Sequence, residues 1–90
     1  MKTEFNNHLE EIAIEIESLS YENIDAWIEE NVVHIVSTNE LILTCGGPNI
    51  RVFIDCGVIK GHKGAYDEPT FVSCNTGILK DYFEIFREAM

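Results

Sequence analysis

The stretch "VVHIVSTNELILTCGGPNIRVFIDCGVIK", residues 32–60, decides the fold, because short turn signals interrupt its apolar and β-branched runs. Thr38–Asn39, the GGPN segment at 46–49 and Cys56–Gly57 separate four runs that are typical of strands. Strands joined by such short connections pair antiparallel, since parallel neighbours need long crossovers. The stretch therefore predicts an antiparallel β-meander of three to four strands.

Helical periodicity flanks the predicted sheet on both sides. Apolar residues recur every three to four positions in two segments before it and in one segment after it. They are Phe5, Leu9, Ile12, Ile16 and Leu19; Ile24, Trp27 and Ile28; and Ile78, Leu79, Tyr82, Phe83, Ile85 and Phe86. We expect one α+β domain over residues 1–90 with the order α-(α)-β-β-β-β-α, in which the N-terminal and C-terminal helices pack on one face of the sheet.

Polar residues near these segments indicate where the helices begin. Asn7 with Glu10 resembles a capping box for the first helix, and Thr3 is an alternative start. Ser20 is the expected cap of the second helix, and either residue of the Asn75–Thr76 pair is expected to open the third.

The composition is that of a small globular protein. Apolar residues make up 46% of the 90 residues, and no apolar run approaches the ~20 residues that a membrane span needs. The first residues, "MKTEFNNHLEEI", turn acidic at once and lack the apolar centre of a signal peptide. Three cysteines without a CxxC pair favour reduced thiols. We therefore expect a cytoplasmic protein.

The glycine-rich part of the opening stretch raises three chemical alternatives, and its residues disfavour each. A phosphate loop aims free N–H groups and a helix N-terminus at the anion, but Pro48 removes a donor and a strand follows. Cysteine catalysis needs a basic environment with a recognised signature. A zinc site needs close ligand pairs, which are absent from Cys45, Cys56, His62 and Cys74. We expect buried, unreactive cysteines, no enzyme activity, no catalytic residue, no metal and no cofactor.

The acidic residues are distributed unevenly. Residues 1–40 contain ten Asp or Glu and one Lys, whereas residues 41–90 contain six acids and five bases, so nearly all of the net charge of −10 lies in the first half. Lys60, His62 and Lys63 form a small basic patch, but the overall charge argues against nucleic-acid binding through it. The acidic half instead favours a partner protein with a basic surface.

Helical spacing places these acids on defined faces. Acids of the first helix lie on both flanks of its apolar stripe and leave one apolar residue exposed between them, and acids of the second helix share one face opposite Trp27. A carboxylate row of this kind can mimic a phosphate backbone, although solubility alone also explains acidic surfaces. The candidate partner-binding residues are Glu4, Glu11, Ile14, Glu15, Glu22, Asp25 and Glu29.

The segment "LILTCGGPNIRVFIDCGVIKGHKG", followed by an aromatic-rich C-terminal helix, resembles small, largely uncharacterised proteins of phages and other mobile elements. The resemblance covers residues 33–88 and consists of a GGPN hairpin and a V-x-G-x-x-G return strand. This chain has "GHKG" where an aromatic residue is usual. The resemblance implies a mobile-element context and supplies no catalytic residue.

Three functional hypotheses follow. The first is an acidic inhibitor that occupies the basic nucleic-acid channel of a nuclease or defence effector in a host cytoplasm, similar to anti-CRISPR proteins that mimic DNA. The second is an immunity protein or antitoxin that neutralises one toxin, and the third is a small structural or oligomeric module. The expected partner is a protein with a basic surface, without direct nucleic-acid or membrane binding, and a homodimer is compatible with the sequence.

Overall fold

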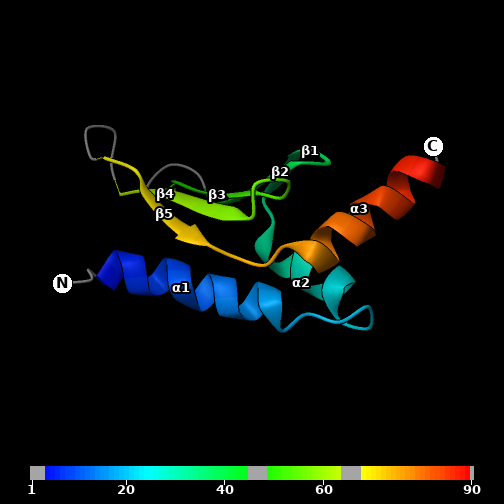
Figure 1. The fold of residues 1–90 in the computed structure, drawn as a ribbon, viewed down its shortest axis with the longest axis horizontal. Helices are drawn as coiled ribbons and strands as arrows, with labels where there is room; N and C mark the ends of the chain where they lie inside the picture. Colours follow the sequence, from blue (N-terminus) through cyan, green and yellow to red (C-terminus); the bar gives the residue numbers. More distant parts are fainter. Residues whose placement is uncertain (1–3, 45–48, 64–67, 90) are drawn as a thin grey trace.

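The structure, a computed structural model, describes residues 4–44, 49–63 and 68–89 (Figure 1). This part of the chain contains three helices and five strands. In chain order they are α1 (Glu4–Glu17), α2 (Ile24–Asn31), β1 (His34–Ser37), β2 (Glu40–Thr44), β3 (Asn49–Phe53), β4 (Val58–His62), β5 (Thr70–Ser73) and α3 (Gly77–Ala89).

The five strands form one antiparallel sheet whose spatial order follows the chain, β1-β2-β3-β4-β5. This confirms the α+β class and the meander, but the predicted number of three to four strands is wrong. The missed strand, β5, has four residues and directly follows Pro69, so its own sequence carries little strand signal. Pairing with β4, from Thr70 opposite Gly61 to Ser73 opposite Val58, places it in the sheet.

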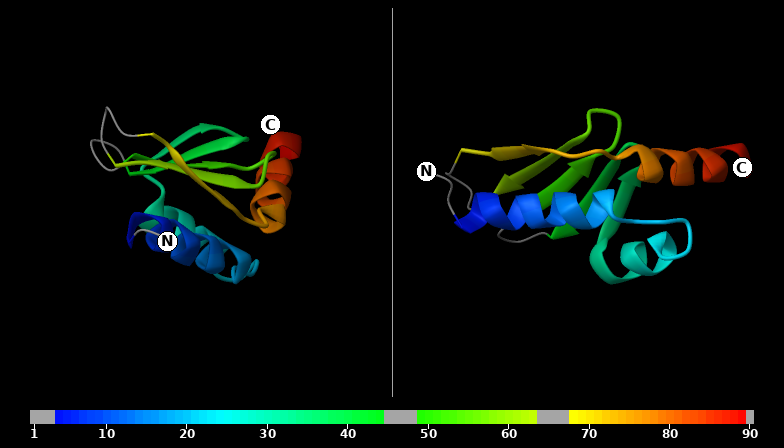
Figure 2. Two further views of the ribbon diagram at one scale, coloured as in Figure 1. Left: turned by 60° about the vertical axis from the view of Figure 1, so that its left-hand side comes forward. Right: turned by 60° about the horizontal axis from the view of Figure 1, so that its bottom comes forward.

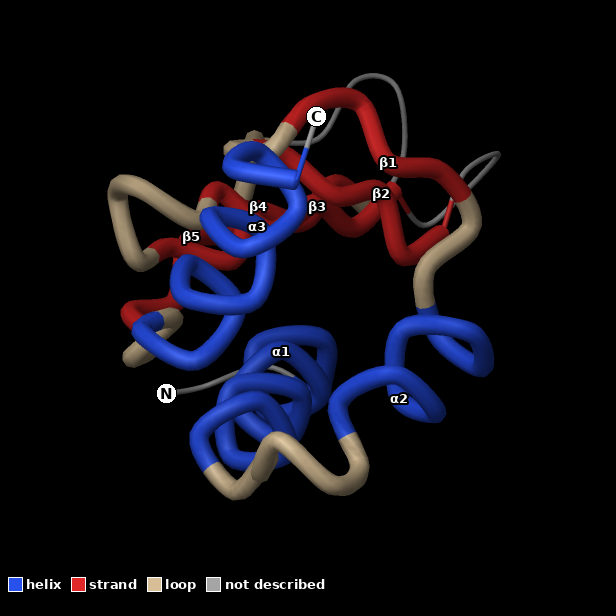
Figure 3. Tube along the Cα trace, turned by 90° about the vertical axis from the view of Figure 1, so that its right-hand side faces the viewer, coloured by secondary structure: helices blue, strands red, loops and turns tan. Residues whose placement is uncertain are grey.

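One face of the sheet, termed the inner face, carries the core. Ile50, Val52 and Ile59 alternate along β3 and β4 with more exposed neighbours and are completely buried. α1 lies across this face and contacts β4 and β5 (Figures 2 and 3). The approach is close at Gly61, where an added Cβ would lie 2.7 Å from the phenyl ring of Phe5. A glycine in β4 therefore lets α1 lie close to the sheet.

The other two helices complete the same core. α2 packs next to α1, and α3 continues from β5 past the end of the sheet (Figures 1 and 3). Trp27 of α2 and Leu79 and Phe83 of α3 belong to one apolar cluster with α1 and the sheet. α3 begins directly after Thr76, as predicted, and the Thr76 hydroxyl donates a hydrogen bond to the carbonyl of Ile54 (2.5 Å). This bond ties the start of α3 to the end of β3.

Two predicted helix starts are wrong. Asn7 lies inside α1 and not at its start, and Thr3 lies outside the described residues. α2 begins at Ile24 with Asn23, not Ser20, at its cap position. The Asn23 side chain accepts a hydrogen bond from the backbone N–H of Ser20 (2.8 Å). Ser20 therefore opens a turn that precedes the helix.

Candidate functional site

The predicted acidic surface of α1 faces solvent. Glu4, Glu11 and Glu15 are exposed on one flank of the helix. Ile14 is 62% exposed although it is apolar, because it lies about 160° around the helix from the buried Ile16. The helix thus presents an apolar side chain with carboxylates on either side, a composition suited to contact with another protein.

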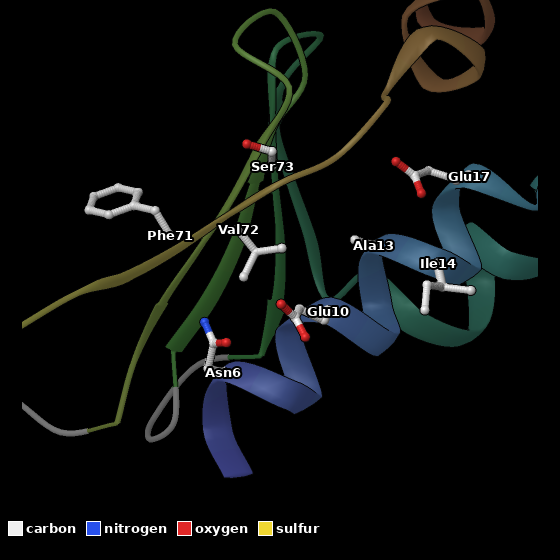
Figure 4. Close-up of a pocket in the computed structure, with 8 residues that line it drawn as sticks. All are labelled: Asn6, Glu10, Ala13, Ile14, Glu17, Phe71, Val72 and Ser73. Carbon is white, nitrogen blue, oxygen red and sulfur yellow. The ribbon is translucent and has the colours of Figure 1, made fainter. Parts of the chain in front are cut away.

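An open groove of about 540 Å³ separates α1 from the edge strand β5 (Figure 4). Figure 4 shows Val72 pointing toward α1, whereas Phe71 leaves β5 on the opposite side. The helix contributes Ile14 together with the carboxylates of Glu10 and Glu17. Because Phe71 is also 59% exposed, the two exposed apolar residues Ile14 and Phe71 lie on either side of an acidic groove.

The predicted acids of the second helix are exposed as well. Glu22 lies in the turn before α2, and Asp25 and Glu29 lie on the helix. Asp25 is already engaged, because its Oδ1 accepts a hydrogen bond from the hydroxyl of Tyr82 in α3. This carboxylate therefore contributes to packing between α2 and α3, a role that the sequence did not indicate.

The seven predicted residues do not form one continuous row. Glu15 lines a hollow of about 130 Å³ with Trp27 and Asn31 on the α1 side of α2. Asp25 lies about 160° around α2 from Trp27 and contacts α3 instead. The structure thus divides the acids into an α1 surface and a separate α2 surface near α3.

Two further acids also hold α3 in place. The Oε2 atom of Glu17 accepts a hydrogen bond from the backbone N–H of Asn75 (2.9 Å), and Asp81 accepts one from the hydroxyl of Tyr21 (3.1 Å). Burial, the bond to Asp25 and nearby acidic charge raise the pKa of Tyr82 to about 12. These partners are 58, 60 and 57 positions apart in the chain, so helical periodicity gives no signal for them.

The cysteines are not equivalent. Cys74 is buried, as predicted, and its Sγ lies 3.7 Å from the carbonyl oxygen of Ala13. Burial, with a smaller contribution from Glu17, raises the pKa of the Cys74 thiol to about 11, so it is protonated and unreactive at neutral pH. Cys56 is exposed, and its predicted burial is wrong because it lies in the turn between β3 and β4. Cys45 lies outside the described residues.

The face of the sheet opposite α1, termed the outer face, carries a second hollow. It measures about 250 Å³ and is lined by Asn49, Arg51, Phe53, Lys60 and His62. Sequence reasoning treated Lys60 and His62 as a minor patch and did not include Arg51. Alternation along β3 and β4 contains the missing signal, because residues between buried ones must point to the opposite face.

Searches for metal sites and membrane spans in the described ranges give two results. No group of three or more His, Cys, Asp or Glu side chains is arranged there to hold a metal ion. None of the helices there has the length and apolar composition that crossing a membrane requires. Comparisons with protein families, curated proteins and solved structures returned no match.

Proposed function

We propose that this chain is an acidic inhibitor that binds the basic, nucleic-acid-binding surface of a nuclease or defence effector. The observation that carries this proposal is the state of the α1 carboxylates. Glu4, Glu11 and Glu15 are exposed, and none of them forms an ion pair with another described residue. Their charge is therefore available to a partner.

The spacing of these carboxylates suits a protein that normally binds nucleic acid. Neighbours on a helix face lie ~5–6 Å apart. Phosphates of one DNA strand rise by ~3.4 Å along the axis and are further apart along their winding path. Lysines and arginines arranged for phosphates can therefore reach Glu11 and Glu15, which are one helical turn apart.

The exposed Ile14 gives such a complex an apolar centre. Carboxylates around it raise the association rate by long-range attraction, whereas desolvation of the apolar side chain slows dissociation. The like-charge arrangement costs the isolated helix ~0.2–0.5 kcal/mol per i,i+4 pair, such as Glu11 with Glu15. A basic partner would remove this repulsion, and that favours the complex over the free protein.

The test compares two double variants that change the net charge equally. Glu11→Lys with Glu15→Lys alters the α1 surface, and Asp55→Lys with Glu84→Lys alters exposed acids on the β3–β4 turn and on α3. Immobilised protein is offered to purified basic nucleases and effectors, and captured protein is challenged with duplex DNA and with salt. We expect capture by the wild type and by the second variant, loss of capture by the first, and release by DNA.

Two outcomes would contradict the proposal. Equal loss in both variants would show that binding follows net charge and not the α1 surface. A captured protein that keeps its nuclease activity and is not displaced by duplex DNA would show that the contact lies outside the nucleic-acid channel. Circular dichroism of each variant separates these results from unfolding.

A further inference from the structure

The outer face gathers basic and amide side chains into one cross-strand arrangement. In the pairing of β3 with β4, Arg51 lies opposite Lys60 and Asn49 lies opposite His62. Directly opposite residues of an antiparallel pair point to the same face, with Cβ atoms ~4.5–5.5 Å apart. All four therefore converge on the hollow of about 250 Å³.

The Arg51–Lys60 pair is locally unfavourable, because like charges directly opposite each other destabilise a sheet. Glu40 offsets part of this repulsion, since its Oε2 lies 2.5 Å from Nη1 of Arg51. Lys60 forms no ion pair with any described residue, and its ammonium instead lies 5.9 Å from the centre of the Phe71 ring. The hollow thus keeps an uncompensated positive charge.

These donors suit a phosphate group. A guanidinium carries five N–H donors in a planar fork, so one contact to Glu40 leaves others for an anion. The Lys60 ammonium adds a point charge from the neighbouring strand, and His62 adds an imidazole on the same face. Charge-assisted bonds from several directions are the usual means of holding phosphate oxygens.

Aromatic rings lie beside these donors. Phe53 lines the hollow, and Phe71 pairs with Lys60 in the neighbouring strand, so its exposed ring lies in the same cross-strand row. Nucleobases stack on exposed aromatic rings of this kind with little dependence on sequence. A phosphate site next to an exposed phenyl ring matches the two ends of a nucleotide.

We propose that the outer face binds a mononucleotide, with its phosphate on Arg51 and Lys60 and its base on Phe71. A free mononucleotide fits better than a nucleic-acid strand, because the hollow is small and the net charge of −10 repels a polyanion. The site is separated from α1 by the sheet, so it does not depend on the function proposed above.

Calorimetric titration of the whole protein tests the assignment with adenosine monophosphate, adenosine, inorganic phosphate and a short single-stranded oligonucleotide. We expect the monophosphate to bind more tightly than the other three. Lys60→Gln should weaken its binding about tenfold or more, whereas Lys80→Gln on α3, a matched loss of one exposed charge, should not. Phe71→Ala should weaken the monophosphate but leave inorganic phosphate unchanged.

The proposal is overturned if the monophosphate binds no better than adenosine, or if the Lys60 and Lys80 variants behave alike. Tighter binding of the oligonucleotide would overturn the mononucleotide assignment in favour of a nucleic-acid platform. Both substitutions lie away from the core, and circular dichroism of each variant confirms that it is folded before its titration is interpreted.

Discussion

The two faces of the sheet are built from the same strands but follow different rules. On β3, the completely buried Ile50 and Val52 alternate with the exposed Asn49 and Arg51. Burial explains the identity of the inner residues, because apolar area removed from water stabilises the fold. Nothing in the packing of the inner face requires a basic residue at position 51, so the composition of the outer face needs a different explanation, such as binding.

The strongest test of this difference is a truncation on the inner face. Ile59→Ala removes a completely buried side chain of β4 and leaves a cavity beneath α1, so unfolding free energy should fall by about 2–5 kcal/mol. Urea denaturation followed by circular dichroism measures this change. A loss below about 1 kcal/mol would mean that the inner face is not the tightly packed core described above.

Overpacking of the same face should have the next largest effect. Gly61→Ala adds a methyl group within 2.7–3.0 Å of ring and side-chain atoms of Phe5 and Leu9, and the expected cost is about 1–3 kcal/mol. Phe5→Leu in the same chain makes room and should recover part of the loss. A double-mutant cycle measures this coupling, and strictly additive effects would disprove the close approach.

The contact between α2 and α3 tests the helical side of the sheet. Tyr82→Phe removes the hydrogen bond to Asp25 and should cost about 0.5–1.5 kcal/mol. The pKa of Tyr82 is raised from 10.0 to about 12, so the folded state favours the protonated hydroxyl. Its contribution is complete below pH 10 and is lost as the pH rises through 12. Urea curves of both proteins should therefore differ at pH 8 and converge near pH 12; a constant difference would contradict this assignment.

The smallest effect is expected on the outer face. Lys60→Gln removes one member of the like-charged pair with Arg51, so stability should change by less than about 0.5 kcal/mol or rise slightly. The same variant is expected to lose mononucleotide binding. A clear loss of stability would instead assign Lys60 a structural role and weaken the contrast between the two faces.

The sequence predicts the parts of this fold that repeat along the chain. The stripe of α1 and the alternation of β2 to β4 are visible as periods of about 3.6 and 2 residues. β5 escapes prediction because four residues after Pro69 show no extended period, and pairing with β4 decides its conformation. The cap of α2 escapes because Ser20 and Asn23 are both good capping residues, and only tertiary packing selects between them.

The candidate site shows the same division. Periodicity predicts that Glu11, Ile14 and Glu15 are exposed, and the structure agrees. It cannot predict that Asp25 meets Tyr82, because that contact joins residues 57 positions apart. The outer-face cluster was readable in part, since Arg51 follows from alternation, but its convergence with Lys60 depends on a strand register that composition does not specify.

The contact of α1 with β4 and β5 also sets the order of events during synthesis. The first helix leaves the ribosome early, but the last strand that it covers ends at Ser73. At ~5–20 residues per second, roughly 3–11 s pass between completion of α1 and completion of β5. For that time the apolar stripe of α1 has no sheet to cover it. The carboxylates on its flanks keep neighbouring nascent chains apart by mutual repulsion, so the acidic half of the protein protects its own folding.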